Sequence, residues 1–169
     1  ALHPNGEEIV TASRNLLLRH WTIETSEVRS TIKAHTSPVL SMDYDATGTI
    51  VATGSSDKTV KVWDIVKGYC THNFRGHEGV VNHLRFHPDI NRLQLVSCSD
   101  DTDIRVWDLS TQRCAAVLKD HMSTVTCVAF SADGWTMVTG GRDKVMQFWD
   151  LRDHSLKKTQ PLYEGLEAC

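Results

Sequence analysis

The sequence predicts an all-β protein built from repeated units of four strands. Four of its five tryptophans recur at nearly constant intervals, 42, 44 and 42 residues apart, at Trp21, Trp63, Trp107 and Trp149. The intervals contain short apolar runs that alternate with polar residues and favour β-branched side chains, which is the pattern of half-buried strands. Gly and Pro fall between these runs, and no stretch of the chain shows the apolar periodicity of an amphipathic helix.

The first unit, residues 1–34, is incomplete and degenerate. Trp21 is followed by Thr22, whereas the later tryptophans are followed by Asp, and Asn15 stands where the later units have a turn Asp. The histidine that precedes each later unit would fall before Ala1. We therefore expect the chain to start in the middle of an inner strand.

The second unit, residues 35–76, defines the pattern best, with strands expected at 39–44, 50–54, 59–63 and 71–74. The third unit, residues 77–120, is two residues longer, and the excess falls in residues 88–93, where a loop absorbs it at small entropic cost. The fourth unit, residues 121–162, ends in an expected outermost strand at 156–162. Residues 163–169 are expected to begin the next repeat.

Composition and charge exclude several classes of protein. The chain has 169 residues, of which 40% are hydrophobic and 23% are charged, which is enough for a globular core and excludes a disordered tail or a fibre. Its 18 basic and 21 acidic residues give a net charge of -3. The chain therefore lacks the excess of basic residues that is typical of proteins that bind nucleic acid mainly by electrostatic attraction. No apolar run is long enough to span a bilayer, and residues 1–8 lack a signal-peptide pattern, so we expect no membrane partner and no export.

Cysteine usage points to a reducing compartment. The five cysteines are odd in number, form no C-x-x-C pair and lie mostly in apolar runs. This pattern predicts reduced, buried thiols in an intracellular protein. The residues concerned are Cys70, Cys98, Cys114, Cys127 and Cys169.

The repeat resembles that of the WD-repeat β-propeller family. The resemblance rests on the 42–44-residue period, the four strands in each unit, a histidine before each unit, and the Trp-Asp pairs that end at Asp64, Asp108 and Asp150. It implies an arc of about four blades from a larger, seven-bladed propeller.

In that family, four residues of each blade form a hydrogen-bonded chain that runs from Trp to Ser or Thr, then to His, then to a turn Asp. A buried indole or imidazole without a partner is costly, so a complete chain fixes the register of the strands. Three units carry residues at the matching positions, and the resemblance implies that they form three such tetrads: His35, Thr53, Asp57 and Trp63; His77, Ser97, Asp101 and Trp107; His121, Thr139, Asp143 and Trp149.

Catalytic and metal-binding interpretations are less favourable. A Ser, His and Asp in one unit could be read as a hydrolase triad, but the trio occurs three times at one period without a G-x-S-x-G elbow. His77, His83 and His87 are spaced irregularly, and no spacing typical of zinc ligands occurs. We therefore expect no enzyme activity, no cofactor, no metal site and no small-molecule substrate.

Variable segments narrow the resemblance further. Residues 9–14, 62–69, 71–77, 86–89, 130–134 and 141–144 resemble the family of transducin-beta-like protein 3 and U3 small nucleolar RNA-associated protein 13. This resemblance implies a scaffold in the small-subunit processome, in the nucleolus, assembled with other propeller proteins and the U3 particle during pre-ribosomal RNA processing.

Two alternatives for the binding partner remain open at this point. A substrate-recognition propeller of a ubiquitin ligase would present an arginine-rich face to acidic peptides, to which Arg85, Arg105, Arg142 and Arg152 could contribute. A local basic bias in the last unit could instead make sparse contacts to the backbone of U3 or pre-ribosomal RNA. The residues of this bias are Arg142, Lys144, Arg152, Lys157 and Lys158.

Overall fold

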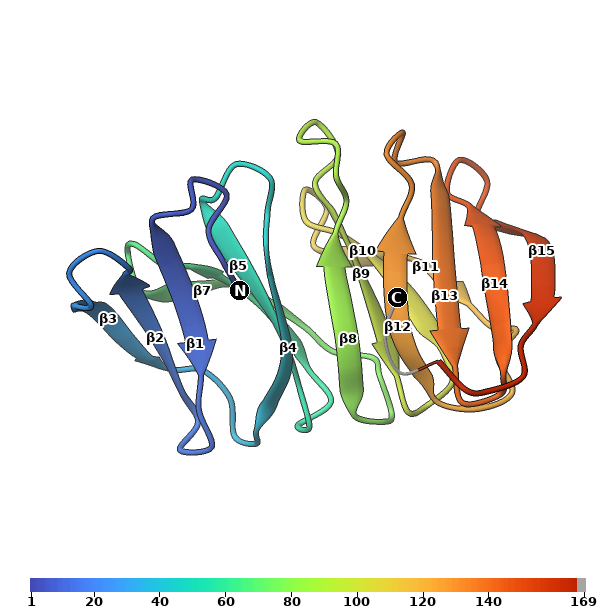
Figure 1. The fold of residues 1–169 in the computed structure, drawn as a ribbon, viewed down its shortest axis with the longest axis horizontal. Coiled ribbons are helices and arrows are strands. Elements are labelled where there is room, and N and C mark those ends of the chain that lie inside the picture. Colours follow the sequence, from blue (N-terminus) through green and yellow to red (C-terminus); the bar gives the residue numbers. More distant parts are fainter. Residues whose placement is uncertain (167–169) are drawn as a thin grey trace.

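The computed structural model describes residues 1–166, which form four antiparallel sheets arranged side by side (Figure 1). All named elements are strands, as predicted, and there is no helix among the described residues. The predicted start of another repeat, at residues 163–169, falls partly on residues 167–169, which lie outside the described part. Consecutive strands are hydrogen-bonded neighbours within every sheet.

The first sheet contains β1 (Glu8–Ala12), β2 (Leu17–Thr22) and β3 (Val28–Lys33), and the second contains β4 (Val39–Tyr44), β5 (Ile50–Ser55), β6 (Val60–Asp64) and β7 (Tyr69–Phe74). The third contains β8 (Val81–Phe86), β9 (Gln94–Ser99), β10 (Ile104–Asp108) and β11 (Arg113–Leu118). The fourth contains β12 (Val125–Phe130), β13 (Thr136–Gly141), β14 (Val145–Asp150) and β15 (Ser155–Pro161).

The start of the chain extends the three-stranded sheet. Ala1 and Val10 exchange backbone hydrogen bonds of 2.8 and 2.9 Å, and the His3 N–H donates to the Glu8 carbonyl at 2.9 Å. Residues 1–3 therefore lie beside β1, at the edge of the sheet that β4, β8 and β12 occupy in the other sheets.

The core lies between the sheets. Each interface buries apolar side chains from both partners, and Trp63, Trp107 and Trp149 each belong to the cluster formed with the preceding sheet. In the interface between the second and third sheets, Gly54 of β5 lies so close to β8 that an added Cβ would be 2.6 Å from Val81 Cγ1. A sheet must bury its apolar face against another element, so the neighbouring sheets depend on one another.

A β-bulge marks each repeat at the same place. The register between the third and fourth strands shifts just before Trp63, Trp107 and Trp149, and between β2 and β3 it shifts before Trp21. A bulge adds one residue to a strand and increases its local twist. The shift recurs because the same Trp position is built in the same way in each sheet.

The cysteines only partly follow the prediction of reduced, buried thiols. Cys98 is a buried free thiol and Cys114 is a half-buried one. Cys70 is free but exposed, because it lies on the outer strand β7. Cys127 is buried in β12 and is disulfide-bonded, so the prediction of a reduced thiol is wrong there. Cys169 lies outside the described residues.

With regard to membranes, residues 1–166 contain no helix with the length and apolar character that a crossing requires.

Candidate functional site

The turn between the second and third strands of each complete sheet positions one Asp side chain. Asp57, Asp101 and Asp143 occupy these turns, and the residue after each of them has a positive φ, of 66°, 70° and 61°. The left-handed residue closes the turn tightly. The carboxylate is then held by backbone N–H groups, as when Asp57 accepts hydrogen bonds from the N–H groups of Thr36 and Thr59.

The structure places all twelve predicted tetrad residues in three hydrogen-bonded chains. The indole N–H donates to the hydroxyl over 2.9, 2.8 and 3.0 Å in the second, third and fourth sheets. The hydroxyl lies 2.7, 2.7 and 2.9 Å from the His Nε2. The His Nδ1 lies 2.9, 2.9 and 2.7 Å from the Asp carboxylate. The chains are Trp63, Thr53, His35 and Asp57; Trp107, Ser97, His77 and Asp101; Trp149, Thr139, His121 and Asp143.

The hydrogen-bond partners determine which atom of each tetrad carries the proton in each hydrogen bond. The carboxylate can only accept, so His Nδ1 donates to it, and Nε2 then accepts the hydroxyl proton while the hydroxyl oxygen accepts the indole N–H. Burial lowers the pKa of His35 despite the attraction of the Asp57 carboxylate, which favours this neutral imidazole. Burial alone would raise the pKa of Asp57, but hydrogen bonds from Thr59 and His35 outweigh it and hold that pKa well below the usual range.

The same geometry argues against a triad that acts on a substrate. Thr53, Ser97 and Thr139 have no exposed surface, so a substrate in solution cannot reach their hydroxyls. Each hydroxyl oxygen also accepts an indole N–H, so a lone pair that a nucleophile would use is already engaged. Within residues 1–166, no group of three or more His, Cys, Asp and Glu side chains is placed to hold a metal ion.

The degenerate first sheet keeps only one link of the tetrad, which sequence reasoning missed. The Trp21 indole N–H donates to Thr11 Oγ1 at 2.8 Å, as the later tryptophans donate to Ser or Thr. The buried His20 lies 2.9 Å from Glu8, and Arg29 contacts the other oxygen of the same carboxylate at 2.7 Å. Thr11 stands ten residues before Trp21, as Thr53 stands before Trp63, so the common spacing was a signal that could have identified it.

Polar contacts also join neighbouring sheets. The Asp43 carboxylate accepts the Phe86 N–H at 2.9 Å, and Ser41 Oγ accepts the Leu84 N–H at 3.2 Å. At the other interface, His87 Nε2 lies 2.9 Å from the Gly134 carbonyl oxygen. These contacts join residues about one repeat apart, and they fix the angle at which one sheet meets the next.

The four arginines of the ligase alternative do not form one surface. Arg85, Arg105 and Arg152 are engaged by three separate carboxylates, those of Asp43, Asp103 and Asp150, at 3.3, 3.4 and 2.5 Å. Arg142 and Arg152 lie in turns at opposite ends of β14. The basic residues of the last unit are likewise spread, since Lys157 lies on the outer strand β15 and pairs with Asp150 and Asp153.

Comparison with known families identifies the repeat. The model for the WD domain, G-beta repeat, matches residues 26–64, 68–108 and 112–150, which is more than half of the chain. The chain belongs to the WD-repeat family. Its sheets are therefore blades of a partial WD β-propeller, and the fold expected from the sequence is confirmed.

The matched WD repeats and the blades are offset by one strand. The repeat at 26–64 begins just before β3, the outer strand of the first blade, and ends with the Trp-Asp of β6 in the second blade. The next two repeats have the same relation to β7–β10 and β11–β14. Each WD repeat therefore ties one blade to the next.

Curated relatives resemble the WD-repeat chain along almost its whole length. Transducin beta-like protein 3 of Rattus norvegicus is 51% identical over 168 residues, and that of Homo sapiens is 50% identical over 169, each covering 99% of the chain and 21% of the relative. U3 small nucleolar RNA-associated protein 13 of Saccharomyces cerevisiae is 31% identical over 179 residues, covering 99% of the chain and 22% of the relative. The chain thus spans about a fifth of the length of these relatives.

Proposed function

We propose that this WD-repeat chain is part of a non-catalytic scaffold for protein–protein assembly in the U3 ribonucleoprotein and the small-subunit processome. It would act in pre-ribosomal RNA processing and ribosome biogenesis, in the nucleolus. The observation that carries the proposal is the similarity over 99% of the chain to a relative named for its association with U3 small nucleolar RNA, together with the 50% identity to transducin beta-like protein 3.

The physical character of the blades supports a scaffold. Three tetrads and the contacts between sheets hold the strands in fixed positions, so exposed loops are presented on a rigid support. We assign the twelve tetrad residues to this support and not to partner binding, because their histidines and hydroxyls are buried.

The proposed partners are chiefly proteins, among them other propeller subunits of the same particle. The net charge of -3 makes an extended electrostatic grip on RNA unfavourable, so contacts to U3 or pre-ribosomal RNA would be sparse and directed at the backbone. The separate pairing of Arg85, Arg105 and Arg152 gives no specific support to the ubiquitin-ligase alternative.

Affinity purification of the full-length protein at mild salt tests the proposal, with mass spectrometry of the proteins and sequencing of the RNA. We expect U3 RNA together with other nucleolar propeller proteins, enriched over a parallel purification of an unrelated WD-repeat protein. Recovery of a cullin or its adaptor without U3 RNA would overturn the proposal in favour of the ligase class.

A further inference from the structure

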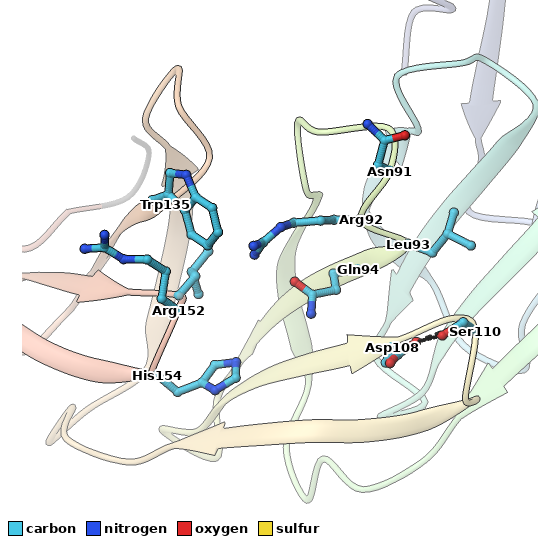
Figure 2. Close-up of a pocket in the computed structure, with 10 residues that line it drawn as sticks. Asn91, Arg92, Leu93, Gln94, Asp108, Ser110, Trp135, Arg152 and His154 are labelled. Carbon is cyan, nitrogen blue, oxygen red and sulfur yellow. Dashed lines mark hydrogen bonds between the residues drawn. The ribbon is translucent and has the colours of Figure 1, made fainter.

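A polar hollow lies between the third and fourth blades, away from the tetrads. It has a volume of about 560 Å³ and opens at the ends of the blades where the β8–β9 loop and the β10–β11 and β14–β15 turns lie (Figure 2). The tetrad Asp residues lie in the turns at the opposite ends of the strands. The lining of this groove comes from both blades: Asn91, Arg92, Leu93, Gln94, Asp108, Ser110, Trp135, Leu151, Arg152 and His154.

An arginine stacked on a tryptophan forms the centre of the groove. The Arg92 guanidinium carbon lies 3.8 Å from the centre of the Trp135 ring, and that of Arg152 lies 5.6 Å from it (Figure 2). Arg152 is already neutralised, because it donates to both oxygens of Asp150 at 2.9 and 2.5 Å. Arg92 makes no ion pair or side-chain hydrogen bond with any residue of the described chain. Its charge is therefore held in place by stacking while its N–H groups stay available.

The third blade supplies this arginine through the extra length of its loop. The two-residue excess of the third unit falls in residues 88–93, and Arg92 comes from that segment across to Trp135 of the next blade. Leu93 of the same loop lines the groove and is more than half exposed. The loop thus supplies one available cation and one exposed apolar side chain to the groove.

The remaining polar groups of the groove differ in whether they are already satisfied. The Asp108 carboxylate accepts from the Ser110 N–H and hydroxyl and from the Thr111 N–H. In contrast, His154 Nε2 is buried without a hydrogen-bond partner. A buried polar atom of this kind favours a ligand that can hydrogen-bond to it.

We propose that the groove binds a short acidic segment of a partner protein, in which an Asp or Glu carboxylate pairs with Arg92 and a neighbouring aliphatic side chain packs on Leu93. A planar guanidinium matches a carboxylate with two parallel hydrogen bonds. The segment carries a single acid at this point and not a run of acids, because the Asp108 carboxylate lines the groove and would repel more negative charge. The inference deepens the scaffold role proposed above and rests on it.

The same geometry disfavours single-stranded RNA as the occupant. A nucleobase would need a free face of Trp135 to stack on, but Arg92 already stacks on this ring and Arg152 lies nearby. A phosphate chain would also run past the Asp108 carboxylate, which lines the groove. A peptide with one carboxylate meets the available cation without displacing the stack.

Selection of random dodecapeptides displayed on phage against the purified full-length protein tests the groove. We expect the enriched peptides to share an Asp or Glu next to Leu, Ile or Val. By fluorescence anisotropy, Arg92→Gln should weaken binding of the most enriched peptide by about tenfold, as for loss of a charge-assisted pair of hydrogen bonds. Arg92→Lys should bind the peptide with an affinity between those of the parent protein and Arg92→Gln. The control Arg14→Gln, which changes an exposed arginine of the first unit, should alter binding less than about twofold.

Thermal melts of the variants control for folding. The groove proposal is overturned if no enriched peptide depends on Arg92, if peptides with Asn or Gln in place of the acid bind equally well, or if a twelve-nucleotide uridine RNA binds in an Arg92-dependent manner in their place. If no peptide binding depends on Arg92 while U3 RNA is still recovered, the groove proposal alone is refuted. Arg92-dependent peptide binding without U3 recovery refutes the processome role alone.

Discussion

Removing one hydroxyl from the third blade is the sharpest test of the tetrads. Ser97 is completely buried, and its Oγ is 2.8 Å from the Trp107 indole nitrogen and 2.7 Å from His77 Nε2. Ser97→Ala removes the partner of both groups, and no solvent reaches them. Each of the two buried groups left unsatisfied costs about 1–3 kcal/mol, so the free energy of unfolding should fall by about 2–6 kcal/mol.

The neighbouring blades provide the matched control. Their tetrads use Thr53 and Thr139 at the same position, so Ser97→Thr keeps the hydroxyl and should stay within about 1 kcal/mol of the parent protein. Ser110→Ala removes an exposed hydroxyl and should cost less than about 0.5 kcal/mol. Urea unfolding followed by tryptophan fluorescence measures all three variants. Equal midpoints for Ser97→Ala and Ser110→Ala would refute the assignment of the tetrads to blade stability.

Three further predictions concern pH, packing and the contacts between blades. The pKa values of His35 and Asp57 are both lowered on folding, so the unfolded chain binds more protons than the folded chain as the solution is acidified. The urea midpoint should therefore decrease when the pH drops below about 6.5, and decrease further below about pH 4. A constant midpoint from pH 7 to pH 3.5 would contradict this. Gly54→Ala should destabilise the protein by about 1–3 kcal/mol through contact with Val81, and Gly54→Ala combined with Val81→Ala should cost less than the two single changes added, as a double-mutant cycle in urea will show; strict additivity would be the negative result. Asp43→Asn keeps an acceptor for a backbone N–H of the next blade and should cost less than about 1 kcal/mol, whereas Asp43→Ala should cost about 1–3 kcal/mol, and equal melting temperatures for the two variants would rule out this contact as a stabilising one.

Contacts within one repeat are more predictable from the sequence than contacts between repeats. The spacing of Trp, Ser or Thr, His and Asp recurs within each repeat, so the resemblance to the WD-repeat family was enough to name three sets of residues from the sequence. The Trp21–Thr11 hydrogen bond was overlooked because the first unit lacks the His that marks the others. The bulge before each tryptophan leaves no trace in the residue types, since it changes pairing without changing composition.

Contacts across blades were not predictable in this way. The His87–Gly134 and Arg92–Trp135 contacts join a loop of one unit to a turn of the next. Their formation depends on the angle between the sheets and on the length of the 88–93 segment, neither of which appears as a periodic signal. The groove between the third and fourth blades belongs to this class, because each blade supplies only half of its lining.

The one-strand offset between WD repeat and blade affects how such a protein can gain or lose blades during evolution. A deletion of one whole period joins two equivalent positions of neighbouring repeats, wherever in the period the deletion begins. The third strand of the blade at the junction, such as β6, is therefore still followed by an outer strand with which it can pair. A deletion of any other length would leave a strand with an unpaired edge, which is prone to aggregation. Changes in the number of blades are therefore constrained in the length of the DNA segment involved but not in where its ends fall.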